Sequence, residues 1–253
     1  MIDIKKARKE FDDYVSKYNK EDFKIALKIN HSYRTAAYAR QIAKEEGLDQ
    51  DLAELIGLLH DIGRFDQIKI YNTFRDGDSI DHANFGARIL KHDNYIEKYC
   101  EDKELQHLII NAVRYHNKYK ISDKIEGKEL VYCKLIRDAD KIDILNYMEY
   151  EDISKLFNFE QILKDELSDK VYKEMLDNKI VNRYDAKTKL DDYMLEIGFL
   201  YDVNYDISIK LIQKNKSIDK LYDRIKNAKE IEKINEIKEH VNEYMKNRIS
   251  NIK

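Results

Sequence analysis

The sequence predicts an all-α protein, and three observations lead to that prediction. The chain of 253 residues contains no proline and only seven glycines, so long helices meet few helix breakers. Apolar residues recur at intervals of three and four residues through most of its length. Runs with the two-residue alternation of a half-buried strand are scarce. With 43% hydrophobic and 38% charged residues, the chain can bury a core and keep a hydrated surface.

The apolar periodicity predicts helices along almost the whole chain. Gly47 and Gly63 stand where two of these helices should stop, because glycine suits the backbone at a helix C-terminus. Asp51 and Glu54 resemble a capping pair at the start of another helix. The expected helices span residues 4–18, 21–46, 50–62, 80–99, 102–119, 128–149, 151–157, 159–177, 187–202, 205–215, 217–228 and 230–250.

The loops and the domain organisation follow from where this periodicity breaks. The expected loops are residues 64–79, 120–127 and 178–186. The first carries Asp76-Gly77-Asp78, a typical turn sequence. No internal repeat or low-complexity linker divides the chain, whose length allows one large domain or two small ones. We expect residues 1–150 to form a helical core and residues 151–253 a helical extension continuous with it.

Six residues have the side chains of a metal site. Imidazole and carboxylate groups are ligands of divalent transition metals. Six such groups can hold two ions with one carboxylate shared between them, an arrangement that drives the hydrolysis of phosphate esters. The six residues are His31, His60, Asp61, His82, His116 and Asp140.

Helical geometry places these candidates on apolar faces. Each residue advances about 100° around a helix, so Asp140 shares a face with Ile136 and Ile144. A carboxylate on an apolar stripe is costly unless a partner compensates its charge, and a metal ion is such a partner. Asp138 is turned by about 200° from Asp140, so we choose Asp140 as the ligand. Asp138 and Asp143 are left as groups that support ligands.

The candidate residues occur in five sequence elements, which stand in a fixed order over residues 31–143. This order resembles the HD-domain superfamily of metal-dependent phosphohydrolases, in the H…HD…H…H…D form with an HDIG motif. The resemblance implies an HD-domain helical bundle with additional C-terminal helices packed on it. The elements are His31, His60-Asp61-Ile62-Gly63-Arg64, His82-Ala83-Asn84-Phe85-Gly86-Ala87-Arg88-Ile89-Leu90, Tyr115-His116-Asn117 and Arg137-Asp138-Ala139-Asp140-Lys141-Ile142-Asp143.

The same resemblance implies roles for the ligands. Asp61 would bridge two divalent ions, with His31, His60 and Asp140 completing the first site and His82 and His116 binding the second. Mn²⁺ or Fe²⁺ suit this mixed ligand set, and Zn²⁺, Co²⁺, Ni²⁺ or Mg²⁺ can replace them.

The implied reaction is hydrolysis of a nucleotide or other small phosphate compound. A hydroxide shared by the two ions would be the nucleophile. Asp61 and Arg64 are the candidate catalytic residues, and Arg64 would contact a phosphate oxygen as a charged donor. For Arg64, the competing interpretation is a surface salt bridge.

Departures from close relatives narrow these expectations. The cyclic-di-GMP phosphodiesterase branch has a Gly-Tyr-Pro motif, which a chain without proline lacks. That branch often has a second histidine where this chain has Asn117, and some of its members add a glutamate ligand where this chain has Leu27. We therefore expect two metals and a substrate other than cyclic-di-GMP.

Two alternatives remain open at this point. One branch of the superfamily uses the same six ligands to hold a mixed-valent di-iron pair, which cleaves a C–C or C–P bond with O₂. Ligand spacing does not separate that oxygenase from a hydrolase. The other alternative is a non-catalytic sensor or scaffold, against which the complete ligand set argues.

Composition bounds the partners and the location. With 46 basic and 49 acidic residues, the chain has no charge excess for general nucleic-acid binding. Cys100 and Cys133 are far apart and do not have a paired spacing. We interpret them as core thiols in a protein of a reducing compartment. No apolar run approaches the ~20 residues of a membrane span, and the start is not a signal peptide. We expect a cytoplasmic protein with a small-molecule phosphate substrate and no membrane association. A homodimer through the C-terminal region stays open, and the remaining histidines, His92, His107 and His240, are expected to lie at the surface.

Overall fold

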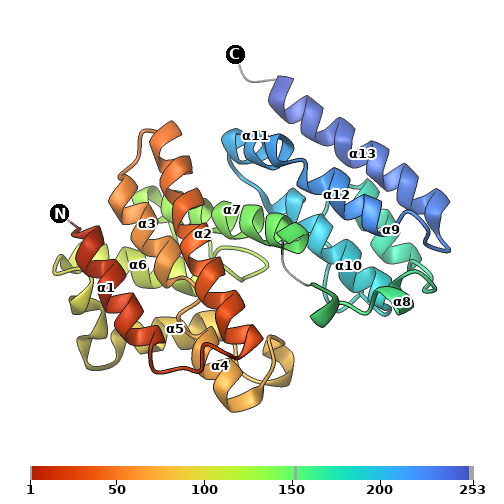
Figure 1. Cartoon of the computed structure of the whole chain (residues 1–253). Helices are drawn as coiled ribbons and strands as arrows, with labels where there is room; N and C mark the ends of the chain where they lie inside the picture. The colour runs from red at the N-terminus through yellow and green to blue at the C-terminus, as the bar shows by residue number, and fades with distance from the viewer. Residues whose placement is uncertain (1, 151–152, 251–253) are drawn as a thin grey trace. The chain divides into compact units, whose positions relative to one another are not determined.

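The computed structural model describes residues 2–150 and 153–250, and within these ranges the regular structure is entirely helical (Figure 1). The prediction of an all-α fold is confirmed. The chain forms two compact units, residues 1–140 and 141–253, whose boundary falls inside α7. The α-helices are α1 Ile4–Val15, α2 Phe23–Glu45, α3 Gln50–Leu59, α4 Arg64–Tyr71, α5 His82–Lys91, α6 Lys103–Tyr115, α7 Gly127–Tyr150, α8 Phe159–Ile162, α9 Asp169–Leu176, α10 Lys189–Gly198, α11 Asp206–Asn215, α12 Ser217–Arg224 and α13 Ile231–Ser250. Short 3₁₀ turns are η1 Asp76–Asp78, η2 His92–Lys98, η3 Ile153–Lys155 and η4 Phe199–Asp202.

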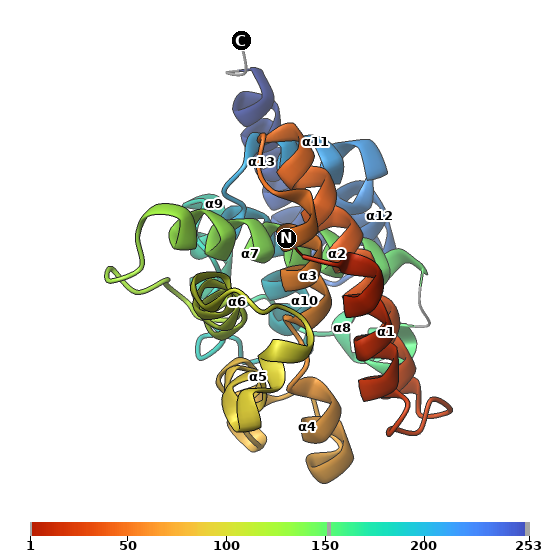
Figure 2. The same cartoon turned by 90° about the vertical axis from the view of Figure 1, so that its left-hand side faces the viewer.

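In the first unit, α3 lies against both α1 and α2 (Figures 1 and 2). A glycine makes the contact with α2 close. A Cβ atom at Gly57 would stand 2.6 Å from the Cα atom of Ala36, a distance that real side chains do not adopt. The absence of a side chain at Gly57 therefore sets how near α2 comes to the end of α3.

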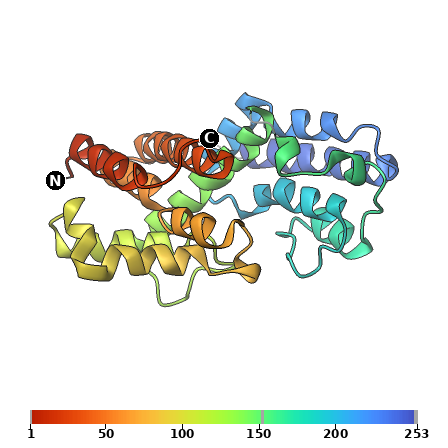
Figure 3. The ribbon, with the colours of Figure 1, turned by 60° about the horizontal axis from the view of Figure 1, so that its bottom comes forward.

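A second glycine sets the approach of α5, which also packs on α6 (Figure 3). A Cβ atom at Gly63 would lie 2.3 Å from the carbonyl oxygen of His82 and 2.7 Å from the backbone nitrogen of Gly86. The turn after α3 and the start of α5 are thereby brought into backbone contact. Three candidate ligands lie at or beside these two contacts. His60 and Asp61 stand between Gly57 and Gly63, and the backbone of His82 contacts Gly63.

The second unit is built from α8 to α13 and the end of α7. There α10 packs on α8 and α9, while α13 packs on α9 and α11 (Figures 1 and 3). A capping box between Thr188 and Asp191 starts α10. Within the described residues, no helix combines the length and the apolar content needed to cross a membrane.

The expected loop over residues 64–79 is wrong in its first half, where α4 forms. Gly63 has a right-handed backbone (φ −74°, ψ −16°), so it does not stop a helix but precedes one. Phe65 explains why the helix is stable, since it is fully buried and its ring packs edge-on against Phe11 and Tyr14. The helix ends at Asn72, whose backbone is left-handed.

Several expected helices are shorter or broken. The helix expected over 80–99 ends at Lys91, because Asp93 and Asn94 adopt positive φ angles. The helix expected over 159–177 divides into α8 and α9, because Ser168 turns its backbone N–H to Asp191 instead of continuing a helix. The helix expected over 187–202 passes into a 3₁₀ turn after Gly198. Of the expected helix 151–157, residues 151–152 lie outside the described ranges and the rest contains only η3.

The predicted caps had mixed outcomes. Gly47 does end α2, with a left-handed backbone at φ +66°. The cap of α3 is Asp49, whose side chain accepts hydrogen bonds from the backbone of Asp51 and Leu52. Glu54 instead is buried and pairs with Arg8 and Arg40. The capping pair predicted from Asp51 and Glu54 is therefore wrong.

Candidate metal centre

Five helices of the first unit deliver the six candidate ligands to one buried place. His31 lies within α2 and Asp140 within α7, whereas the others stand at helix ends. His60 is the C-cap of α3 and Asp61 follows it. His82 begins α5 and His116 is the C-cap of α6. All six side chains are buried.

The first group of donor atoms surrounds a common point. His31 Nε2 lies 3.1 Å from His60 Nε2 and 3.2 Å from Asp140 Oδ1. His60 Nε2 lies 3.6 Å from the same Asp140 oxygen. Asp61 Oδ2 is 3.5 Å from the Nε2 atoms of both His31 and His60. Two nitrogens and two carboxylate oxygens thus face one another.

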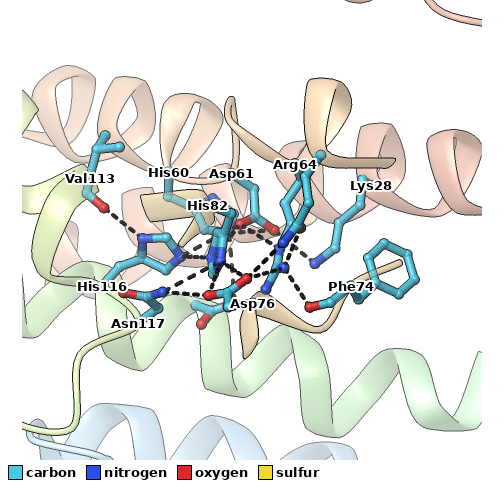
Figure 4. Close-up of polar contacts among 12 residues, drawn as sticks. Lys28, His60, Asp61, Arg64, Phe74, Asp76, His82, Val113, His116 and Asn117 are labelled. Carbon is cyan, nitrogen blue, oxygen red and sulfur yellow. Dashed lines mark hydrogen bonds and ion pairs between the residues drawn. The ribbon is translucent and has the colours of Figure 1, made fainter. Parts of the chain in front are cut away.

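The second group forms around the other oxygen of Asp61. His82 Nε2 and His116 Nε2 are 3.0 Å apart. Asp61 Oδ1 lies 3.3 Å from His82 Nε2 and 3.5 Å from His116 Nε2 (Figure 4). The Asp61 carboxylate therefore presents one oxygen to each pair of histidines.

Hydrogen bonds at Nδ1 orient three of the imidazoles. His60 Nδ1 donates to the carbonyl oxygen of Gly57 and His116 Nδ1 to that of Val113, both at 2.7 Å. His82 Nδ1 donates to Asp76 Oδ2, also at 2.7 Å. Because these acceptors hold the proton on Nδ1, the Nε2 lone pairs of the neutral rings point at one another. Lone pairs that converge in this way need a cation between them.

The donor spacing fits a divalent ion. Ligand atoms about 2.1 Å from a tetrahedral metal are about 3.4 Å apart. The separations of 3.0 to 3.6 Å found in the two groups match this spacing. The chemistry of the donors, imidazole nitrogen with carboxylate oxygen, also suits a transition metal. The residues present therefore fit the metals that the motif implies.

The environment of three candidate ligands, His82, His116 and Asp61, shifts their pKa values toward the protonation states that bind metals. Burial lowers the pKa of His82 to about 3, with the charge of Arg64 acting in the same direction. Burial also lowers the pKa of His116. Burial alone would raise the pKa of Asp61, but the charges of Lys28 and His60 hold it well below its usual range. His82 and His116 are thus neutral and Asp61 is ionised near neutral pH.

The sequence analysis did not identify Asp76 as part of this site. Its carboxylate binds His82 and also accepts hydrogen bonds from Arg64, Gln67 and Asn117 (Figure 4). The pKa of Asp76 is lowered, since these contacts outweigh the opposing effect of burial. The turn sequence Asp76-Gly77-Asp78 drew attention only as a loop. Its position in the segment between the HD pair and His82 was the available signal.

Lys28 is a second residue that the sequence analysis missed. Its Nζ atom lies 2.7 Å from Asp61 Oδ2 (Figure 4). It stands one turn before His31 on α2, so its spacing from a candidate ligand could have drawn attention to it.

Arg64 lies beside the centre but is held by its own loop. Its Nη1 atom donates to Gln67 Oε1, to the carbonyl oxygen of Phe74 and to Asp76 Oδ1. Its Nε atom lies 3.6 Å from Asp61 Oδ1. Nε is buried and has no hydrogen-bond partner within the described ranges.

The other polar residues of the sequence elements and the remaining histidines differ in how far they are buried. Asp138 and Asp143 are fully buried in α7, and Asn84 is exposed and bonds to Asp81. His92 and His107 are largely exposed, with 81% and 68% of their side chains accessible. His240 is partly exposed and bonds to Asn178.

Comparison with known proteins supports the motif assignment. The family model of the HD domain matches residues 29–145. The recognition of an HD domain made from the sequence is therefore confirmed over these residues. The match contains all six candidate ligands.

A curated relative matches part of this chain. The chain is 36% identical over 114 residues to ribonuclease Y of Opitutus terrae. The aligned part covers 45% of this chain and only 17% of the relative. No solved structure matches the chain.

Proposed function

We propose that this protein is a phosphohydrolase that holds two divalent ions, Mn²⁺ or Fe²⁺ by preference, in its HD domain. The supporting observation is the position of Asp61, whose two oxygens face separate histidine pairs. A carboxylate placed in this way is suited to bridge two ions. His31, His60 and Asp140 would hold the first ion, and His82 and His116 the second.

Each protein group has a role in this proposal. When bound, two divalent ions make a water molecule nucleophilic near neutral pH and neutralise charge on phosphate oxygens. Asp61 and Asp140 lower the net charge of the centre, and the Nδ1 hydrogen bonds fix the tautomer and orientation of the imidazoles. Arg64 offers its unpaired Nε–H beside Asp61 as a donor to a phosphate oxygen.

We propose a nucleotide or another small phosphate ester as the substrate. The name of the curated relative adds RNA phosphodiesters to the compounds worth testing. The overall charge of −3 gives no support to broad nucleic-acid binding, so a short oligoribonucleotide is the appropriate form of that test.

The test is a hydrolysis screen with Mn²⁺ over nucleoside mono-, di- and triphosphates, cyclic nucleotides, aryl phosphates and a short RNA. We expect wild-type turnover and its abolition, by at least about a hundredfold, in Asp61→Ala. Manganese content should fall in the same variant, because both sites lose a ligand, while the circular dichroism of the helices persists.

His107→Ala is the matched control. His107 lies on α6, the helix that ends at His116, but 68% of its side chain is exposed. This variant should keep both turnover and metal content. Full turnover in Asp61→Ala would refute the mechanism. A mixed-valent di-iron EPR signal with O₂ consumption, and no hydrolysis of any ester, would replace the proposal by the oxygenase alternative.

A further inference from the structure

Lys28 is a nearly buried cation at the edge of the candidate metal centre. Only 13% of its side chain is exposed, and its Nζ atom lies 2.7 Å from Asp61 Oδ2. It precedes His31 by one turn on α2, so both side chains emerge on the same side of the helix. The ring of Phe74 lies 5.5 Å from Nζ, within the range of a cation–π contact (Figure 4). Lys28 is thereby held at the centre from two directions.

The charges of the loaded centre leave Lys28 uncompensated. Among the six candidate ligands only Asp61 and Asp140 have a side chain that carries negative charge, since the other four are histidines. Two divalent ions would more than neutralise both carboxylates. Arg64 has its own carboxylate partner in Asp76, at 2.9 Å, whereas Lys28 shares Asp61 with the ions. A buried centre with surplus positive charge favours an anionic ligand.

The geometry places this surplus of positive charge beside the first metal site, where a phosphate would bind. A carboxylate oxygen has two lone pairs, so Asp61 Oδ2 can face the first metal site and Lys28 together. Nζ then stands beside that site with donors left over, because an ammonium group has three. Lysine is an effective point charge for phosphate.

From these contacts we propose that Lys28 is a substrate-binding residue, whose ammonium group contacts a non-bridging oxygen of the phosphate that the centre attacks. This inference rests on the proposed phosphohydrolase function and adds to it a second cation from the protein, beside Arg64. The competing explanation is that Lys28 only neutralises Asp61. Under that explanation, replacing Lys28 would not change phosphate binding once the ions are present.

The experiment measures binding of inorganic phosphate to the manganese-loaded full-length protein by calorimetry. We expect Lys28→Met to weaken phosphate binding about 10- to 100-fold, the range for a lost hydrogen bond between charged groups. Lys28→Arg should recover most of the affinity. Manganese content of Lys28→Met should equal or exceed that of the wild type, because a like charge beside the ions has been removed.

Two further variants make the result interpretable. Lys24→Met is the matched control, since Lys24 lies one turn earlier on α2 and bonds to Asn72, away from Asp61. Its phosphate affinity should be unchanged. Lys28→Gln keeps a donor for Asp61 and serves if Lys28→Met does not fold. In hydrolysis the Lys28 variants should raise KM more than they lower kcat.

The outcomes separate this inference from the proposed function. Unchanged phosphate affinity in folded, manganese-loaded Lys28→Met and Lys28→Gln would overturn it. Loss of manganese from both variants would also overturn it, because Lys28 would then serve the metals and not the phosphate. Lysine-dependent phosphate binding by a wild-type protein that hydrolyses no ester would keep the anion site and reject hydrolysis.

Discussion

At the scale of single residues, the partners of the Nδ1 atoms decide what the histidines can do. Two of them donate to backbone carbonyls of their own helices, which the fold supplies without any further side chain. His82 instead depends on the carboxylate of Asp76, which comes from a loop. In the proposed two-metal centre, the position held by His82 is therefore the one that a single substitution outside the ligands can disturb.

We predict that Asp76→Ala weakens the second metal position selectively. Without the carboxylate, His82 loses the group that fixes its orientation and Arg64 loses its ion-pair partner. Loss of such a supporting carboxylate costs about 10- to 100-fold in metal affinity. Titration with Mn²⁺ should show one tight site and one weakened site.

The control for this prediction is Asp78→Ala, two residues away in the same 3₁₀ turn. Asp78 is 65% exposed and lies 4.0 Å from the side chain of Arg75, outside the metal centre. Its variant should bind manganese as the wild type does. Equal affinity of both positions in Asp76→Ala would show that Asp76 has no positioning role.

At the scale of helices, two glycines without side-chain chemistry position the ligands. Gly57 lets α2 approach the end of α3, which brings His31 to His60. Gly63 lets α5 approach the turn after α3, which brings His82 to Asp61. Four of the six candidate ligands, His31, His60, Asp61 and His82, lie on the segments whose backbones are in contact at these points.

We predict that Gly57→Ala moves α2 and α3 apart. The new Cβ atom would stand 2.6 Å from Ala36 Cα, and both atoms belong to rigid helices. Overpacking of this kind costs about 1–3 kcal/mol, measurable by urea denaturation. Manganese at the first site, shared by His31 and His60, should be lost before manganese at the second.

Gly77→Ala is the matched control, since a Cβ atom there meets nothing within 4 Å. Its urea midpoint and manganese content should stay close to those of the wild type. A Gly57→Ala variant as stable as Gly77→Ala would mean that the contact between α2 and α3 is not tight.

The helices were predictable from the sequence where a single run of apolar residues with helical spacing corresponds to a single helix. The prediction failed where a glycine was interpreted from its usual local role. Gly63 looked like a helix stop because its function, a close approach to α5, involves residues far along the chain. The same limit explains α4, whose stability depends on packing of Phe65 against α1.

The candidate ligands could be chosen from sequence because their order and their inward-facing positions agree. Asp76 and Lys28 could not be chosen in the same way. Lysine is frequent on an exposed helix face and aspartate is frequent in a turn, so neither residue type is informative there. Their significance depends on contacts with His82 and Asp61 that only the folded chain creates.

At the scale of the whole molecule, the HD domain match and the compact units do not end at the same residue. The match ends at residue 145, and the first unit ends at residue 140, both inside α7. Asp140 stands at the end of the first unit on a helix that continues to Tyr150. We propose that the functional core is residues 1–150, because it keeps α7 whole, with residues 151–253 as its extension.

The stability of the whole chain should reflect the cost of burying these ligands, and we predict that the metal-free protein loses stability as the pH falls. The pKa of His82 is about 3 in the folded chain against 6.5 for an unperturbed histidine. Between these values the unfolded chain binds a proton that the folded chain does not, so unfolding takes up protons and becomes easier in acid. The stability is fully present above pH 6.5 and is lost as the pH falls toward 3.

The measurement is the urea midpoint of EDTA-treated protein between about pH 5 and pH 7, compared with that of His82→Gln. Glutamine does not titrate, so the variant should show a smaller fall in midpoint over this range. His107→Gln, which replaces an exposed histidine, should follow the wild-type dependence. A wild-type midpoint that stays constant or rises toward acid would contradict the burial of a neutral His82. Added Mn²⁺ should raise the midpoint near neutral pH, because an ion that binds only the folded chain stabilises it.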